Sequence, residues 1–390
     1  MDLIIVNTQP IPSSGVGAAS VNRILSYTKG LIKDGNVVKI LSTANGDNKN
    51  WGHFEGVPVL HLGNRSKGLP RRVVGYIVTT CRLLRALKKE KKDVVIFVTS
   101  NYFLTIILEI YCKVSNTRVV NERSEYPFIL MTQNRLKRLF APLYTNTAYK
   151  LLDGMIIMTQ PLMTYYKKKA GKHCRFIEVP MTVDSQRFSS KAVGNVEQRF
   201  GNYIAYCGNM GGNKDGLPNL LKAFSIVEKR GIPLNLVLIG GAANQQEYDT
   251  LKSLNASLGN KHVVFFGKAN RDEMPGLLHG ATMLALARPS GLQSTGGFPT
   301  KLGEYLSTGN PVVVTAVGDI PQYLHDRENA YVVAPDDNEA FADAICYVWE
   351  NKQQATLVGK KGQELASTVF NGDYQAKRIE SFLHELIEKA

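Results

Sequence analysis

Cysteine is scarce in this chain, and its few cysteines follow no pattern. Cys81, Cys112, Cys174, Cys207 and Cys346 are scattered over 390 residues, without a CxxC pair among them. A disulfide framework or a structural zinc site would need cysteines at matched spacings. The seven histidines show no metal-ligand spacing either. We therefore expect no disulfide scaffold and no bound metal, and the cysteine usage suits a reducing, cytoplasmic compartment.

Long hydrophobic runs are also missing. The most apolar segment, residues 102–114, is shorter than the roughly 20 residues that a spanning helix needs, and it contains Glu109. The N-terminal residues lack a basic region followed by a long apolar core, so we expect no signal peptide. With 44% hydrophobic and 21% charged residues, the composition is that of a globular protein and not of a disordered one.

Acidic residues are outnumbered, with 33 Asp and Glu against 47 Lys and Arg, which gives a net charge of +14. Such an excess favours an anionic partner: nucleic acid, acidic lipid or a phosphorylated substrate. The sequence has no RNP, zinc-finger or helix-turn-helix signature, so we expect no nucleic-acid partner.

Basic residues cluster in the first half of the chain. Residues 65–92 hold ten of them and a single acid, which is typical of solvated helix faces. Residues 135–144 mix Arg135, Lys137 and Arg138 with leucines and aromatic side chains, which is typical of a helix lying on anionic lipid. We therefore expect docking on an anionic membrane surface through residues 135–144, at the inner face of the plasma membrane.

Short apolar strands alternate with helical segments along the whole chain. In the first half, a strand at residues 3–6 precedes a glycine loop and a helix at residues 18–32. In the second half, a strand at residues 203–207 precedes another glycine loop and a helix at residues 217–228. This alternation predicts parallel sheets covered by helices on both faces. We expect two doubly wound, Rossmann-like α/β domains facing across a cleft.

The most specific pattern runs from residue 283 to residue 319. An apolar strand leads through a loop rich in Gly, Ser and Thr to a helix that opens at Thr300. Unpaired N–H groups at a helix start, together with glycines, favour an anion. Lys301 adds a positive charge, and Glu304 lies one turn further on, suited to a diol such as a ribose. The stretch indicates a nucleotide site, although such loops also occur without ligands and Glu304 could be a solvated helix residue.

A weaker glycine pattern follows the first strand. Gly15 and Gly17 have the spacing of a dinucleotide fingerprint, but Ser20 occupies the third glycine position. A loop that faces a substrate and a tight turn without a ligand are equally open alternatives.

The stretch FPTKLGEYLSTGNPVVVTAVGD, within the two-half pattern, resembles the GT-B glycosyltransferases and most closely their family four. The resemblance covers nearly the whole chain. Glu304 falls on the second Glu of the family's E-x7-E pattern, which contacts the ribose. Residues 207–216 are similar to the family's diphosphate loop, with Lys214 on its lysine. The resemblance implies a GT-B fold with an acceptor-binding domain at residues 1–182, completed by a crossing helix at 373–390, and a nucleotide-sugar-binding domain at 183–372.

The resemblance also implies a reaction. A sugar would move from a UDP- or GDP-linked donor to a lipid-linked saccharide of a surface polysaccharide, with retention and without a metal or other cofactor. Two family positions differ, because Gly296 replaces the first Glu and Asn209 replaces an arginine. Arg288, Gln293 and the backbone N–H groups of Gly297 and Phe298 are candidates to replace the lost sugar contact. The expected donor-binding residues are Gly15, Gly17, Asn209, Lys214, Arg288, Gly297, Phe298, Thr300, Lys301 and Glu304.

Candidate catalytic residues lie at the end of a strand in the first half. The family often has a histidine there, whereas this chain has Glu122, with Glu125 close behind. Either carboxylate could activate an acceptor hydroxyl within hydrogen-bond reach. The alternative is a structural ion pair between Glu122 and Arg123. Two rival functions also stay open: a nucleotide-sugar epimerase of the same fold, and a non-catalytic nucleotide-sugar-binding subunit.

Overall fold

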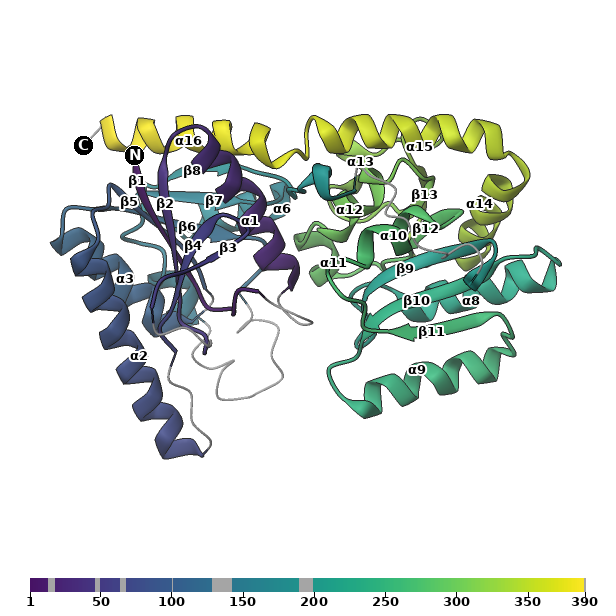
Figure 1. The fold of residues 1–390 in the computed structure, drawn as a ribbon, viewed down its shortest axis with the longest axis horizontal. Coiled ribbons are helices and arrows are strands. Elements are labelled where there is room, and N and C mark those ends of the chain that lie inside the picture. Colours follow the sequence, from purple (N-terminus) through teal and green to yellow (C-terminus); the bar gives the residue numbers. More distant parts are fainter. Residues whose placement is uncertain are drawn as a thin grey trace. The chain divides into compact units, whose positions relative to one another are not determined.

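The structure is a computed structural model that describes residues 1–12, 18–45, 50–63, 68–99, 101–127, 142–188 and 199–388. The chain forms two compact units, one of Met1–Pro180 with Gly372–Ala390 and one of Met181–Asn371 (Figure 1). The sequence predicted divisions after residues 182 and 372, and the observed ones fall after residues 180 and 371.

The first unit is built on an eight-stranded sheet in the order β3-β4-β2-β1-β5-β6-β7-β8. Neighbouring strands are parallel, except in the antiparallel β3–β4 hairpin. The central strand β1 is buried from residue 3 to residue 7, because helices cover both faces of the sheet. The strands are β1 (Asp2–Asn7), β2 (Val37–Ser42), β3 (Gly52–Phe54), β4 (Val57–His61), β5 (Val94–Val98), β6 (Arg118–Arg123), β7 (Gly154–Ile157) and β8 (Arg175–Glu178).

Two helices far apart in the sequence pack together on one face of this sheet. A Cβ at Gly30 of α1 would lie 2.5 Å from the Cβ of Ala376 of α16, so the glycine permits their close approach. Ile379 and Leu383 of α16 join β1 and α1 in one hydrophobic core. The helices of the unit are α1 (Ala18–Lys33), α2 (Leu69–Lys89), α3 (Tyr102–Val114), α6 (Gln160–Lys167) and α16 (Gly372–Glu388).

The second unit has a six-stranded parallel sheet in the order β11-β10-β9-β12-β13-β14. From β9 the chain first builds outward to β10 and β11, and then returns to add β12, β13 and β14 on the other side of β9. The strands are β9 (Tyr203–Asn209), β10 (Asn235–Gly241), β11 (Val263–Gly267), β12 (Met283–Leu286), β13 (Val312–Thr315) and β14 (Tyr331–Val333).

Helices again cover this sheet on both faces (Figure 1). They are η1 (Ser185–Phe188), α8 (Leu217–Lys229), α9 (Gln245–Leu258), α10 (Met274–His279), α11 (Leu292–Gly296), α12 (Lys301–Ser307), α13 (Ile320–Tyr323), α14 (Asn338–Glu350) and α15 (Lys352–Ser367). In the part of the chain that the structure describes, no helix combines the length and the apolar character needed to cross a membrane.

Candidate functional site

The candidate site of the second unit lies where its strand order reverses. Strands β9 and β12 are neighbours, but the chain leaves them in opposite directions across the sheet. Ligands of doubly wound folds bind outside the carboxyl ends of the strands at such a point. The loop that leads from β9 to α8 and the loop that leads from β12 to α12 both begin there. These are the two loops that the sequence analysis singled out.

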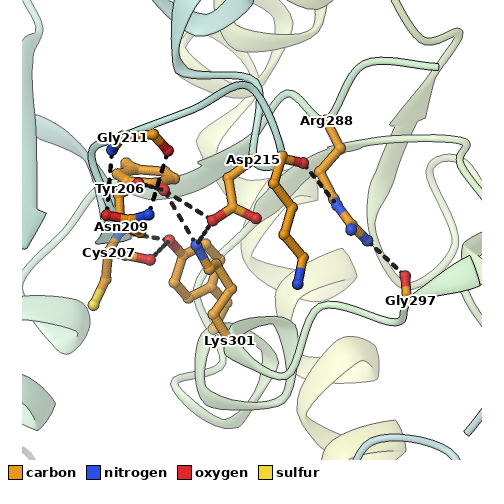
Figure 2. A network of polar contacts seen from close by, with 10 residues as sticks. Tyr206, Cys207, Asn209, Gly211, Asp215, Arg288, Gly297 and Lys301 are labelled. Carbon is orange, nitrogen blue, oxygen red and sulfur yellow. Dashed lines mark hydrogen bonds and ion pairs between the residues drawn. The ribbon is translucent and has the colours of Figure 1, made fainter. Parts of the chain in front are cut away.

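Lys301, the first residue of α12, forms a partly buried ion pair with the loop that follows β9. Its Nζ lies 2.6 Å from Oδ2 of Asp215, and each side chain is 14% exposed. The same Nζ donates to the Tyr206 hydroxyl at 3.2 Å and lies 4.6 Å from the centre of that ring, a cation–π contact. Figure 2 shows these groups converging. The charge of Lys301 is therefore partly balanced within the site.

Asp215 is charged in this environment. Burial alone would raise the pKa of its carboxyl, but the charge and hydrogen bond of Lys301, with the nearby Arg288 and Lys214, lower the pKa below its ordinary value. The sequence analysis missed Asp215, and its position directly after Lys214 was the one available signal.

Two buried tyrosines fix the end of β9. The Tyr206 hydroxyl lies 2.8 Å from the carbonyl oxygen of Asn209 and 3.2 Å from Asp215 Oδ2. The Tyr305 hydroxyl accepts from the backbone N–H of Cys207 at 2.6 Å and lies 3.2 Å from its carbonyl oxygen. Burial raises the pKa of both phenols well above the ordinary value, so they stay protonated at neutral pH. Tyr305 therefore anchors α12 to β9.

Arg288 connects the two loops. Its guanidinium is fully buried and donates to the carbonyl oxygens of Lys214, at 3.3 Å, and Gly297, at 2.8 Å (Figure 2). We expected Arg288 to contact the donor sugar. The structure instead places it beneath the loops, where it holds their backbones.

Glycine is needed where α8 begins. Gly216 has a φ of 71°, and a Cβ there would lie 1.7 Å from the carbonyl oxygen of Ala287. The first turn of α8 can therefore approach the end of β12 directly. This places the N–H groups of a 13-residue helix beside the two loops.

The remaining predicted donor residues are distributed around these loops. Asn209 closes a turn, exchanging hydrogen bonds with the backbone of Gly211 at 3.2 and 3.3 Å. The buried ring of Phe298 packs against Tyr323 and Phe370 in the core. The predicted donor residues Lys214, Thr300 and Glu304 are half-buried, and Gly297 is buried.

The charge of Glu304 acts on the end of β9. Burial and, next in size, the charge of Glu304 raise the pKa of the Cys207 thiol to about 12. The Glu304 carboxylate therefore lies within electrostatic reach of the strand end, on the same helix as Lys301.

In the first unit, Glu122 forms a buried ion pair. Its Oε1 lies 2.7 Å from Nε of Arg23, and both side chains are 1% exposed. Arg23 also donates to the carbonyl oxygens of Val179, at 2.8 Å, and Pro180. This arrangement favours the structural alternative over catalysis by Glu122, because the carboxylate is enclosed and held. The partner is Arg23, however, and not the predicted Arg123.

Arg123 is also buried, but it serves another contact. It donates to the carbonyl oxygen of Thr99 at 2.7 Å and to the Tyr166 hydroxyl at 2.8 Å. Glu125 is half-buried and stays a candidate for acceptor activation. The predicted loop residues Gly15 and Gly17, and residues 135–141 of the predicted membrane helix, lie outside the described residues. Among the described residues, no cluster of three His, Cys, Asp or Glu side chains could hold a metal ion.

The fold is that of the GT-B glycosyltransferases. A sucrose-phosphate synthase from Thermosynechococcus elongatus superposes with a TM-score of 0.76 at 16% identity, over 100% of both chains. The Anabaena protein HepE, solved with UDP-glucose, gives a TM-score of 0.75 at 15% identity, over 98% of this chain and 99% of that one. At such identities the likeness establishes the fold. The prediction of two Rossmann-like domains is confirmed.

The second unit carries a known family signature. Residues 201–351 match the family described as glycosyl transferases group 1. D-rhamnosyltransferase WbpZ of Pseudomonas aeruginosa is 29% identical over 135 residues. A GDP-mannose-dependent phosphatidylinositol monomannoside mannosyltransferase of Mycobacterium tuberculosis is 26% identical over 175 residues. These alignments span 34% and 44%, respectively, of this chain and of each relative. The resemblance read from the sequence is therefore confirmed.

Proposed function

We propose that this protein is a hexosyltransferase that uses a UDP- or GDP-linked sugar as donor. The observation that carries the proposal is the charged site at the β9–β12 reversal, inside the segment that matches the glycosyl transferase family. The solved structures of HepE with UDP-glucose, and a relative described as GDP-mannose-dependent, support the donor class.

The site's chemistry fits a nucleoside diphosphate. The diphosphate would lie over the loop after β9, against the N–H groups at the start of α8 and the charges of Lys214 and Lys301. Asp215 already balances part of the charge of Lys301, and Lys214 would add a second positive charge to the contact with the diphosphate. Glu304 would accept hydrogen bonds from the ribose.

We extend the proposal to the acceptor side as well. The acceptor would be a lipid-linked saccharide of a surface polysaccharide, the anomeric configuration would be retained, and no metal would take part. Glu125 is the remaining described candidate for activating the acceptor hydroxyl. Peripheral binding to the inner face of the plasma membrane would bring the protein to such an acceptor.

A donor panel tests the proposal. Purified protein is incubated with UDP-glucose, UDP-galactose and GDP-mannose, and the products are separated by chromatography. We expect slow release of UDP or GDP with free sugar, which is hydrolysis of the donor in the absence of an acceptor. Conversion to another nucleotide sugar without release would indicate an epimerase. Binding without turnover, even with an added saccharide acceptor, would indicate a non-catalytic subunit.

The ribose assignment has a separate test. Glu304→Gln should reduce the preference for ribonucleotides over deoxyribonucleotides, because a charged hydrogen bond contributes roughly 1.5–3 kcal/mol. Calorimetry with UDP and dUDP, and with GDP and dGDP, measures this preference. Glu350→Gln, an exposed position at the end of α14, is the matched control. Equal binding of both sugars by the unmodified protein would exclude a ribose contact at Glu304.

A further inference from the structure

Exposed apolar side chains gather on two helices of the first unit. Thirteen large hydrophobic side chains are exposed among the described residues, and six of them lie on α2 and α3. These six, which we call the α2–α3 apolar set, are Val73, Val74, Ile77, Phe103, Ile110 and Val114, each between 51% and 84% exposed. Single exposed apolar residues are common on protein surfaces, but a gathered set indicates an interaction site.

Helix α2 has a buried apolar inner side and an outer side whose character changes along the helix. Its inner side is closed by Leu83 and Leu87, which are fully buried against the sheet. Along its outer side, Val74 and Ile77 occupy the early turns, and Arg85 and Lys88 follow at helical spacing further along. The outer side is therefore apolar near the start of the helix and basic toward its end.

All charged residues of α2 are basic. The helix carries six basic residues and no acidic residue. All six are exposed: Arg71, Arg72, Arg82, Arg85, Lys88 and Lys89. Arg71 and Arg72 directly precede Val73 and Val74, so positive charges border the apolar residues.

Helix α3 extends the surface. Right-handed crossovers from β4 to β5 and from β5 to β6 place α2 and α3 on the same face of the sheet, and Figure 1 shows both helices along one flank of the unit. The Tyr76 hydroxyl of α2 donates to the side chain of Asn101, which caps α3, at 3.1 Å. The single acid of α3, Glu109, is buried and faces away from solvent. The two helices thus combine exposed apolar groups with an excess of basic residues on α2.

We propose that the α2–α3 face docks on an anionic lipid bilayer. The basic residues match the surface charge of acidic lipids, and the α2–α3 apolar set enters the interface between headgroups and acyl chains. A second copy of the chain fits poorly, since pairing α2 with α2 would bring twelve positive charges together. Nucleic acid would engage the charges but leave the apolar groups unused. The α2–α3 face is built from other residues of the sequence than 135–144, and docking requires no sugar transfer.

The test is co-sedimentation with vesicles, in the absence of nucleotide. Vesicles of phosphatidylcholine alone are compared with vesicles containing phosphatidylglycerol, at low and high salt. The full chain should bind the anionic vesicles, and binding should weaken with salt. In the charge variant Arg71→Glu/Arg72→Glu, partitioning should fall by at least about 25-fold, because each basic residue near an anionic surface strengthens binding roughly fivefold.

Two matched controls make the result specific. Lys167→Glu/Lys168→Glu changes the net charge equally at exposed positions around the end of α6, and its binding should stay within about threefold of the unmodified protein. The apolar variant Val74→Ser/Ile77→Ser keeps all charges and should still lose several-fold in binding. Leu357→Ser, exposed on α15 of the second unit, should lose none.

Three outcomes would overturn the proposal. Equal losses in the α2 and α6 charge variants would mean that only net charge matters. Unchanged binding in both α2 variants would place the lipid contact elsewhere. Concentration-dependent dimerisation that the apolar variant abolishes, without vesicle binding, would identify a second copy as the occupant. Thermal unfolding of each variant checks that the fold is intact. The same measurement with UDP or GDP checks that the donor site is intact, so a failure of membrane docking can be told apart from a failure of the proposed reaction.

Discussion

The role of Lys301 can be tested by substituting the neighbouring Gly208. A Cβ built at residue 208 would lie 2.0 Å from Lys301 Nζ and 2.8 Å from the Tyr206 hydroxyl. Tyr206 is fully buried, whereas the ammonium is the end of a flexible side chain. The added methyl group of Gly208→Ala should therefore push the ammonium away from Asp215. The nearest atoms belong to side chains, although residue 208 has a φ of 158°, so the substitution also strains the backbone at the end of β9.

The expected loss follows from the contact that is displaced. If Lys301 contacts the diphosphate, removing that charged hydrogen bond costs roughly 1.5–3 kcal/mol, or about 10- to 150-fold in affinity. Lys301→Ala should show this full loss in calorimetry with UDP or GDP. Gly208→Ala should show a loss of about tenfold, since a displaced ammonium retains part of its attraction.

A double-mutant cycle decides whether the glycine acts through the lysine. In the Lys301→Ala background, Gly208→Ala should have almost no further effect, because there is no ammonium left to displace. Uridine and guanosine, which lack phosphates, should bind all variants equally. Lys222→Ala, an exposed position on α8, is the control for loss of a positive charge. If Gly208→Ala weakens UDP or GDP binding equally in both backgrounds, the methyl group blocks the phosphates directly and the reasoning about Lys301 fails.

Three other substitutions test buried charges. Glu122→Gln should lower the free energy of unfolding by roughly 3–5 kcal/mol, because it leaves the Arg23 guanidinium buried without its counter-charge; a loss below about 1 kcal/mol in urea unfolding would contradict this. Asp215→Asn should cost about 1–3 kcal/mol at pH 7. Since the folded pKa of this carboxyl is lowered, its contribution is present above the unfolded pKa and is lost as pH falls through the folded pKa, so the stabilities of variant and parent should converge in acid. Burial raises the pKa of Glu109 to about 8, so stability should fall as pH rises from about 4.5 to 8, by at most roughly 1.4 kcal/mol per unit. Glu109→Gln should remove that slope, and an unchanged slope would exclude Glu109 as its source.

The groups around Glu109 bear on this last measurement. The backbone of Leu151 and the charge of Lys113 lower the pKa of Glu109, against the larger effect of burial. The thiols of Cys112 and Cys174 lie within electrostatic reach, but burial raises the pKa of each to about 12. Neither thiol titrates between pH 4.5 and 8, so the slope in that window is not theirs.

The sequence predicted those parts of the site that are formed by residues close together in the chain. The strand–loop–helix units around residues 203–217 and 283–301 were found because apolar strands, glycines and helix starts are short-range signals. The position of Glu304 one turn after Lys301 followed from helical spacing alone. Both lie on α12, as the sequence predicted.

The pairings that define the site depend on distant residues. Lys301 and Asp215 are 86 residues apart, and Arg23 and Glu122 are 99 apart. No local pattern distinguishes Arg23 from Arg123 as the partner of Glu122, since both arginines are chemically suited to it. Arg288 was read as a ligand contact because its burial depends on how two loops pack together.

Helix α16 has a consequence for the order in which the chain can fold during synthesis. Its apolar residues, among them Ile379 and Leu383, complete the core of the first unit, whereas the second unit comprises Met181–Asn371. Domains generally fold as units while the ribosome extends the chain. The N-terminal unit therefore lacks part of its core, beside α1, until residues 372–388 have been made. The unit that is translated second can be the first to reach its native state.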